Sequence, residues 1–103
     1  RSSFQSPAYN AVKMIEAAMG GEKFTLPAGC YVNCDKCGFK NVMMAMPSTI
    51  DKTGVHFTEP AGTEEEMASL AKSYEHLCKM RDEIVELGIV PAVEKWNELN
   101  PNL

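Results

Sequence analysis

The chain has 103 residues, of which 45% are hydrophobic and 23% are charged, a balance that is typical of a folded domain and excludes a disordered tail. No apolar run approaches the roughly 20 residues that a membrane-spanning helix needs, so a spanning segment is excluded as well. The chain is also too short for a barrel enzyme, or for a dinucleotide-binding fold together with its substrate domain. We therefore expect a single domain over residues 1–103.

The net charge of −4 is divided unevenly between the two halves of the chain. Residues 1–58 carry six basic and four acidic side chains, whereas residues 59–103 carry four basic and ten acidic ones. An acidic chain argues against a general nucleic-acid binder, whose affinity depends on neutralising phosphates. The acidic C-terminal half is interpreted as a solvated helical face, and the functional alternative is a docking site for a basic protein partner.

The first predicted element is a helix over residues 7–19. Ser6 is the predicted N-cap, Pro7 suits the first helical position, and Gly20-Gly21 ends the apolar periodicity. The sequence opens at Arg1 without an initiator methionine, which predicts a trimmed chain, a fragment or a processed product.

Residues 23–58 are predicted to form a small β unit that carries most of the cysteines. A short strand is expected over residues 23–26, and the strongest strand pattern covers residues 39–46. Residues 47–54 are predicted as a loop, and residues 55–58 as the partner strand of a hairpin. Within the strongest strand the side chains alternate, with Val42, Met44 and Met46 on one face and Met43 and Ala45 on the other.

Residues 63–99 are predicted to be helical, which makes the fold class α+β. Thr63 and Glu66 have the spacing of a capping box, and Gly88 is expected to end a long helix. A short final helix is expected to begin near Pro91. The apolar seam of the long helix comprises Met67, Leu70, Tyr74, Leu77, Ile84 and Leu87, and Arg81 interrupts it.

Three cysteines lie within eight residues, and they are the strongest chemical signal in the sequence. Cys30, Cys34 and Cys37 have the spacing C-x3-C-x2-C, and Cys78 follows on the predicted long helix. A disulfide within the cluster would close a very small loop and gain little from chain entropy. A metal site is therefore favoured, with disulfides or reduced structural thiols as alternatives.

Residues 34–39 have the form C-x-x-C-G-aromatic, in which two thiolates clasp one ion if the chain turns tightly. Gly38 tolerates a positive φ at that turn, while Lys36 and Lys40 offset part of the thiolate charge. The segment resembles the knuckle of zinc ribbons and rubredoxins over six residues. This resemblance implies a metal site and is shared by many families.

The other ligands must come from elsewhere, because the chain has no second C-x-x-C. Cys30 is predicted as the third ligand and Cys78 as the fourth, with His56 as the alternative fourth ligand. The spacing C-x3-C-x2-C also resembles the cluster signature of radical-SAM enzymes. However, Lys36 stands where that family has an aromatic residue, and the chain is too short for that family's barrel.

No arrangement of nucleophile, base and acid is visible, so the sequence predicts a non-enzymatic structural or protein-interaction module stapled by zinc. One alternative is a nucleic-acid-associated regulator that uses the basic lobe Lys23, Lys36, Lys40 and Lys52. Another is a small iron–sulfur subunit, since four thiolates also suit that cluster. Zinc-bound thiolates persist in reducing compartments, so an intracellular protein without disulfides is expected.

Overall fold

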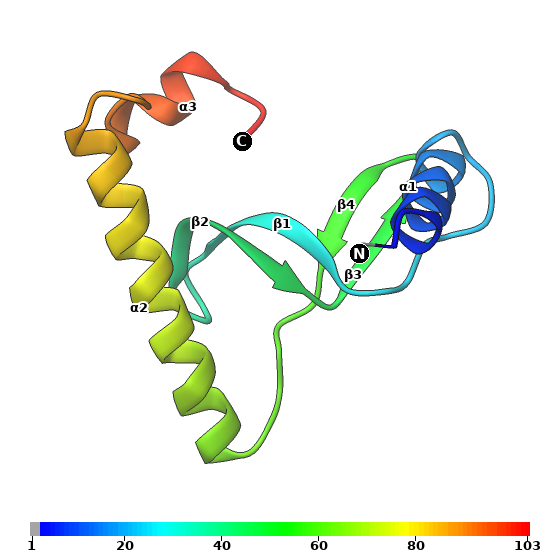
Figure 1. The fold of residues 1–103 in the computed structure, drawn as a ribbon, viewed down its shortest axis with the longest axis horizontal. Coiled ribbons are helices and arrows are strands. Elements are labelled where there is room, and N and C mark those ends of the chain that lie inside the picture. The colour runs from blue at the N-terminus through cyan, green and yellow to red at the C-terminus, as the bar shows by residue number, and fades with distance from the viewer. Residues whose placement is uncertain (1–2) are drawn as a thin grey trace. The chain divides into compact units, whose positions relative to one another are not determined.

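The computed structural model describes residues 3–103, so Arg1 and the prediction based on it lie outside the described residues. Within this range the fold is α+β, with three α-helices and two small antiparallel hairpins, which confirms the predicted class (Figure 1). In chain order the elements are α1 (Gln5–Ala18), β1 (Ala28–Cys34), β2 (Phe39–Met46), β3 (Ser48–Asp51), β4 (Gly54–Phe57), α2 (Glu64–Glu86), a 3₁₀ turn (Val93–Lys95) and α3 (Trp96–Leu99).

The chain divides into two compact units, each with its own packing. The first unit comprises the described residues up to Cys30 together with Ala45–Pro60. The second comprises Tyr31–Met44 and Ala61–Leu103. The division falls within β1 and β2, so each of these strands contributes residues to both units. A single cooperative domain over residues 1–103 stays a prediction.

The core of the first unit lies where α1 meets the chain before β1. A bridge joins Phe24 and Ile50, whose backbone N–H groups donate to each other's carbonyl oxygens at 3.1 and 2.8 Å. The strand predicted over residues 23–26 is therefore reduced to this single bridge. Four buried apolar side chains form the core, with Met14 packed against them: Ala17, Phe24, Ala28 and Ile50.

The hairpin of the first unit pairs β3 with β4, which corrects two predictions. The register runs from Ser48 opposite Phe57 to Asp51 opposite Gly54, so the turn consists of the two residues 52 and 53. Residues 47–54 are thus not a loop, and residues 55–58 do not pair with residues 39–46. Thr49 and Ile50 are β-branched and favour a strand. The loop was predicted because the preceding Pro47-Ser48 pair is typical of a turn.

α1 begins two residues earlier and ends one residue earlier than the predicted range 7–19. Phe4 is the N-cap and makes no side-chain capping bond, so the prediction of Ser6 as the cap is wrong. Pro7 is tolerated because the first-turn N–H groups have no partner within a helix. Gly20 adopts a φ of +96°, which supports the predicted stop.

α2 dominates the second unit and follows the sequence prediction closely. The Thr63 side chain accepts a hydrogen bond from the Glu66 N–H at 3.2 Å. The Glu66 carboxylate in turn accepts one from the Thr63 N–H at 2.8 Å, so the capping box is confirmed. Gly88 follows the helix with a φ of +73°, as expected for its end.

β2 spans the predicted residues 39–46, and its partner is β1, which the sequence did not predict as a strand. Val42, Met44 and Met46 are buried and Met43 and Ala45 are exposed, which confirms the predicted alternation. In β1 the buried positions are Ala28, Cys30 and Val32. The cysteine motif therefore begins inside a strand rather than in an open loop.

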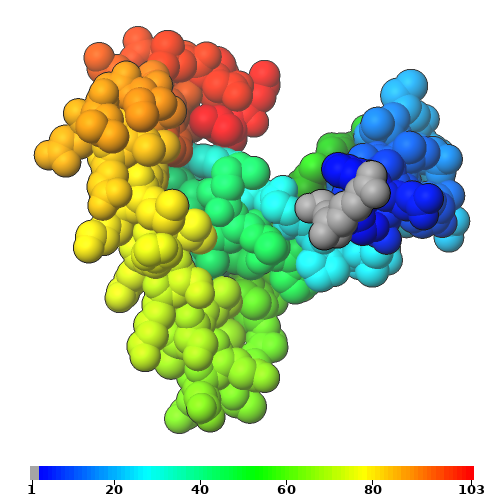
Figure 2. Space-filling model, in the orientation of Figure 1, coloured from blue at the N-terminus to red at the C-terminus, as the bar shows by residue number. Residues whose placement is uncertain are grey.

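Both main helices leave apolar surface uncovered. The side chains of Phe4, Val12, Ile15 and Met19 are between 53% and 82% exposed, and of the residues of α1 only Ala17 is buried. Much of α1 (blue) accordingly stands at the molecular surface in Figure 2. All residues of α2 are described, and none of them is fully buried. In residues 3–103, no helix has both the length and the apolar character that crossing a bilayer requires.

Candidate functional site

The turn between β1 and β2 brings Cys34 and Cys37 together. The Cys37 backbone N–H donates a hydrogen bond to the Cys34 sulfur at 3.3 Å, and the Gly38 N–H donates to the Cys34 carbonyl at 3.1 Å. Gly38 has a φ of +77°, which confirms its predicted role in this turn. Both cysteines are half-buried. The local geometry is that of a compact turn with two sulfur-bearing side chains at its ends.

Charged side chains on this turn pair with each other. The Lys40 ammonium forms an ion pair with the Asp35 carboxylate, and both side chains are largely exposed. Their hydrogen bond raises the pKa of Lys40 and lowers the pKa of Asp35. Lys40 was predicted to offset part of the thiolate charge, and its ammonium group is instead paired with the Asp35 carboxylate.

The other predicted ligands have their own partners. Cys30 is buried in the first unit, where its sulfur lies 3.0 Å from the Ser48 hydroxyl and 3.4 Å from the Ala28 carbonyl oxygen. Cys78 lies on α2 in the second unit and is half-buried. A hydrogen bond between the Cys78 thiol and the Tyr74 hydroxyl is the main cause that raises the pKa of Tyr74, and burial adds to it.

His56, the alternative ligand, lies in β4 of the first unit. Its Nε2 atom is 2.8 Å from the Thr53 hydroxyl oxygen and 3.7 Å from the Asp51 carboxylate. Among the described residues, no group of three or more histidine, cysteine or acidic side chains converges as a metal site does. The site built from Cys30, Cys34, Cys37 and Cys78 stays a prediction, and so does the identity of its metal.

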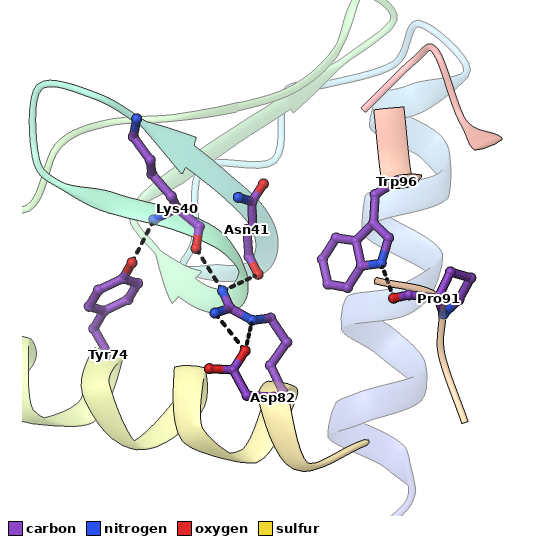
Figure 3. Close-up of polar contacts among 7 residues, drawn as sticks. Lys40, Asn41, Tyr74, Asp82, Pro91 and Trp96 are labelled. Atoms are coloured by element: carbon purple, nitrogen blue, oxygen red, sulfur yellow. Dashed lines mark hydrogen bonds and ion pairs between the residues drawn. The ribbon is translucent and has the colours of Figure 1, made fainter. Parts of the chain in front are cut away.

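Sequence reasoning missed a set of polar contacts at a bulge in β2 (Figure 3). Asn41 has a φ of +56°, and its side-chain oxygen accepts a hydrogen bond from the Tyr31 hydroxyl at 2.6 Å. The Lys40 N–H donates to the Tyr74 hydroxyl oxygen at 3.2 Å. One Arg81 nitrogen donates to the Lys40 and Asn41 carbonyl oxygens at 3.3 and 3.1 Å. Side chains from α2 thus bind backbone groups at the bulge.

A mainly apolar recess of about 360 Å³ lies beside this bulge, within the second unit. Trp96 forms part of its wall, and the indole N–H donates to the Pro91 carbonyl at 2.8 Å. The Tyr31 and Trp96 rings are tilted, with centroids 6.4 Å apart. Other apolar lining side chains are Val42, Met43, Leu77, Met80 and Ile84.

The turn of the β3–β4 hairpin leads to a prediction on acid stability. Hydrogen bonds from the Thr53 hydroxyl and backbone N–H lower the pKa of Asp51 below its ordinary 3.8. As the pH falls, Asp51 takes up its proton in the unfolded chain before it does so in the folded chain. The contribution of Asp51 to the free energy of unfolding is therefore complete above about pH 4, and it disappears as the pH falls through the lower folded pKa. Thr53→Val removes the hydroxyl donor and is expected to raise the pKa of Asp51.

The change is measured by following the Asp51 carboxyl carbon by NMR from about pH 2 to about pH 6, a range that includes the ordinary value of 3.8. Thr58→Val is the control. Thr58 is exposed, follows β4 and is not one of the groups that shift the pKa of Asp51. An unchanged titration of Asp51 in Thr53→Val would contradict the prediction, because it would leave the lowered pKa to the Thr53 backbone N–H and the charges of His56 and Lys23.

Comparison with known proteins gives a partial similarity to a dehydrogenase. No protein-family model matches the sequence. The chain is similar to a malate dehydrogenase of Geobacillus kaustophilus (strain HTA426), with 33% identity over 75 residues. The match covers 72% of this chain and 24% of that protein. The chain therefore spans about a quarter of the length of the curated relative that it matches.

Proposed function

We propose that this chain forms one segment of a larger dehydrogenase that acts on malate or a similar hydroxy acid. The observation that carries the proposal is the 33% identity to a malate dehydrogenase over most of this chain. The matched protein is about four times longer than the match, so the segment would supply part of the protein body and not the whole catalytic unit.

The exposed apolar surface supports this proposal. At 100° per residue, one face of α1 gathers five apolar side chains into a sector of roughly 80°. We call this set the α1 apolar face; it consists of Phe4, Ala8, Val12, Ile15 and Met19. Contiguous exposed apolar surface on a soluble protein marks a contact surface. Burial of each large side chain would contribute about 1.5–3 kcal/mol, which favours a covering layer from the rest of a longer protein.

The chemistry assigned to the larger protein requires a hydride acceptor. Oxidation of malate to its keto acid removes a hydride from the carbinol carbon and a proton from the hydroxyl group, and nicotinamide or flavin cofactors accept hydrides. This chain contains no G-x-G-x-x-G fingerprint for a dinucleotide. The proposal therefore assigns cofactor binding to the remainder of the protein.

A chimera tests this proposal. The matching segment of the Geobacillus kaustophilus enzyme is replaced by α1 through α2 of the present chain, and malate-dependent reduction of a nicotinamide cofactor is measured. A chimera that folds and turns over malate within about tenfold of the parent enzyme supports the proposal, since tenfold corresponds to about 1.4 kcal/mol. A chimera that unfolds, or that folds without activity, contradicts it.

The zinc-stapled interaction module is the second candidate, and the turn at Cys34 and Cys37 favours it. The N–H that points at the Cys34 sulfur is the kind of contact that supports a sulfur ligand, and tetrahedral zinc takes two ligands from such a turn. Cys30 and Cys78 are the proposed remaining ligands, and a basic protein is the proposed partner of the acidic C-terminal half. An intracellular location belongs to the same proposal.

Elemental analysis of the purified protein is the measurement for this second candidate. One zinc per chain is expected, and Cys34→Ser is expected to lose it together with part of the folding free energy. Cys78→Ala should lower the zinc affinity if Cys78 is a ligand, and otherwise cause only a small packing loss. Stoichiometric zinc with unchanged melting in Cys34→Ser would remove Cys34 from the site, while bound iron would favour an iron–sulfur subunit.

A further inference from the structure

We propose that Cys34 and Cys37 form a reversible dithiol–disulfide modification site at the tip of the β1–β2 hairpin. The oxidant belongs to the class of low-molecular-weight disulfides. This inference goes beyond both proposed functions and rests on the geometry of one turn. It applies to the metal-free turn, because zinc bound to the same two sulfurs would occupy them.

The turn holds the two side chains within reach of each other. The Cys37 nitrogen is 3.3 Å from the Cys34 sulfur, and its own Cα is one bond further along the chain. The Cys34 sulfur is therefore less than about 5 Å from the Cys37 Cα. A disulfide needs Cα atoms about 4.4–6.8 Å apart, a range that the ends of a tight turn satisfy. The Cys37 sulfur lies 4.0 Å from the Cys34 carbonyl oxygen, so it already stands at the Cys34 end of the turn.

The other two cysteines are placed less favourably for this chemistry. Cys30 is only 5% exposed, and its sulfur contacts the Ser48 hydroxyl at 3.0 Å. Cys78 is half-buried like the pair, but it lies on α2, and no other cysteine stands within forty residues of it in the sequence. Cys34 and Cys37 are half-buried, so a small oxidant reaches them from solvent. Cys34 and Cys37 are therefore both accessible to a small oxidant and close to each other.

Two exchange steps complete the oxidation. The Cys34 thiolate attacks one sulfur of the small disulfide, forms a mixed disulfide and releases one small thiolate. The Cys37 thiolate then attacks the Cys34 sulfur, forms the Cys34–Cys37 bond and releases the second small thiolate. The two protein thiols lose two protons and two electrons, and the small disulfide is reduced to two thiols. The Cys37 N–H points at the Cys34 sulfur, which carries the charge in the first step.

The experiment treats the whole chain with oxidised glutathione in the presence of a metal chelator. Intact mass should fall by roughly 2 Da, the mass of two hydrogens, and the titratable thiols should fall from four to two. Because the second step is intramolecular, the singly glutathionylated protein should not accumulate. In Cys37→Ser that adduct should accumulate on Cys34 instead. Cys30→Ser and Cys78→Ser, which keep the pair, should oxidise as the unchanged chain does.

Peptide mapping without reduction decides the outcome. A peptide that contains Cys34 linked to Cys37, and that returns to two thiols with dithiothreitol, supports the proposal. Four remaining thiols, two stable glutathione adducts at the turn, or a disulfide that includes Cys30 or Cys78 would each overturn it.

Discussion

Replacing Arg81 by methionine is expected to destabilise the second unit by about 1.5–3 kcal/mol, the range for hydrogen bonds that involve a charged group. Methionine keeps a long apolar stem but cannot donate to the carbonyl oxygens of Lys40 and Asn41. The Arg81 side chain is 19% exposed, so water replaces its donors only in part. Urea unfolding followed by Trp96 fluorescence measures the loss, because Trp96 belongs to the same unit.

Lys79→Met is the matched control for this prediction. It removes the same charge from an exposed position on the same helix, and the expected change is within about 0.5 kcal/mol. Equal losses in the two variants would assign the effect to helix charge and not to the bulge. Arg81→Lys is expected to fall between the extremes, since an ammonium keeps the charge without the planar geometry of a guanidinium.

Local signals in the sequence predicted the parts of the fold whose determinants lie close together along the chain. The capping box needs only Thr63 and Glu66, which are three residues apart, and both of its hydrogen bonds form. The alternation in residues 42–46 likewise depends on one strand with one buried face. Gly88 ends α2 because a positive φ suits glycine wherever the helix lies in the fold.

The bulge in β2 could not be predicted from local signals in the sequence. Phe39 and Val42 are both buried although two residues separate them, so the two-residue period is broken at Asn41. The backbone groups around that break bind Tyr74 and Arg81, which lie more than thirty residues further along the chain. The sequence offered one signal for these contacts, which was Arg81 in the apolar seam of α2. Its role could not be predicted, because its acceptors are backbone carbonyl oxygens of β2.

The candidate site shows the same distinction between local and long-range determinants. The spacing of Cys34 and Cys37, followed by Gly38, predicted a tight turn, because three or four residues are enough to define one. The placement of Cys30 and Cys78 depends on tertiary packing. Cys30 follows the alternation of β1 into the core, and β1 was missed because Gly29 and Asn33, both weak strand formers, directly precede its two cysteines.

The α1 apolar face leads to the second large prediction, which compares one substitution in two settings. Ile15→Lys in the chain alone is expected to change the free energy of unfolding by no more than about 0.5 kcal/mol, because Ile15 is 62% exposed there. In the malate dehydrogenase chimera, the same substitution would place an unpaired charge under the covering layer. The expected loss there is about 3–5 kcal/mol, with malate turnover falling as the folded fraction falls.

Ile15→Leu is the control in both settings, because it keeps an apolar side chain of equal size and should cost less than about 1.5 kcal/mol even when buried. Thermal unfolding and malate-dependent cofactor reduction are measured on all variants. If Ile15→Lys leaves the chimera as stable and as active as Ile15→Leu does, the rest of the larger protein does not cover this face. A loss confined to the chimera would mean that the larger protein covers the α1 apolar face. The chain alone tolerates the same charge because water reaches Ile15 there.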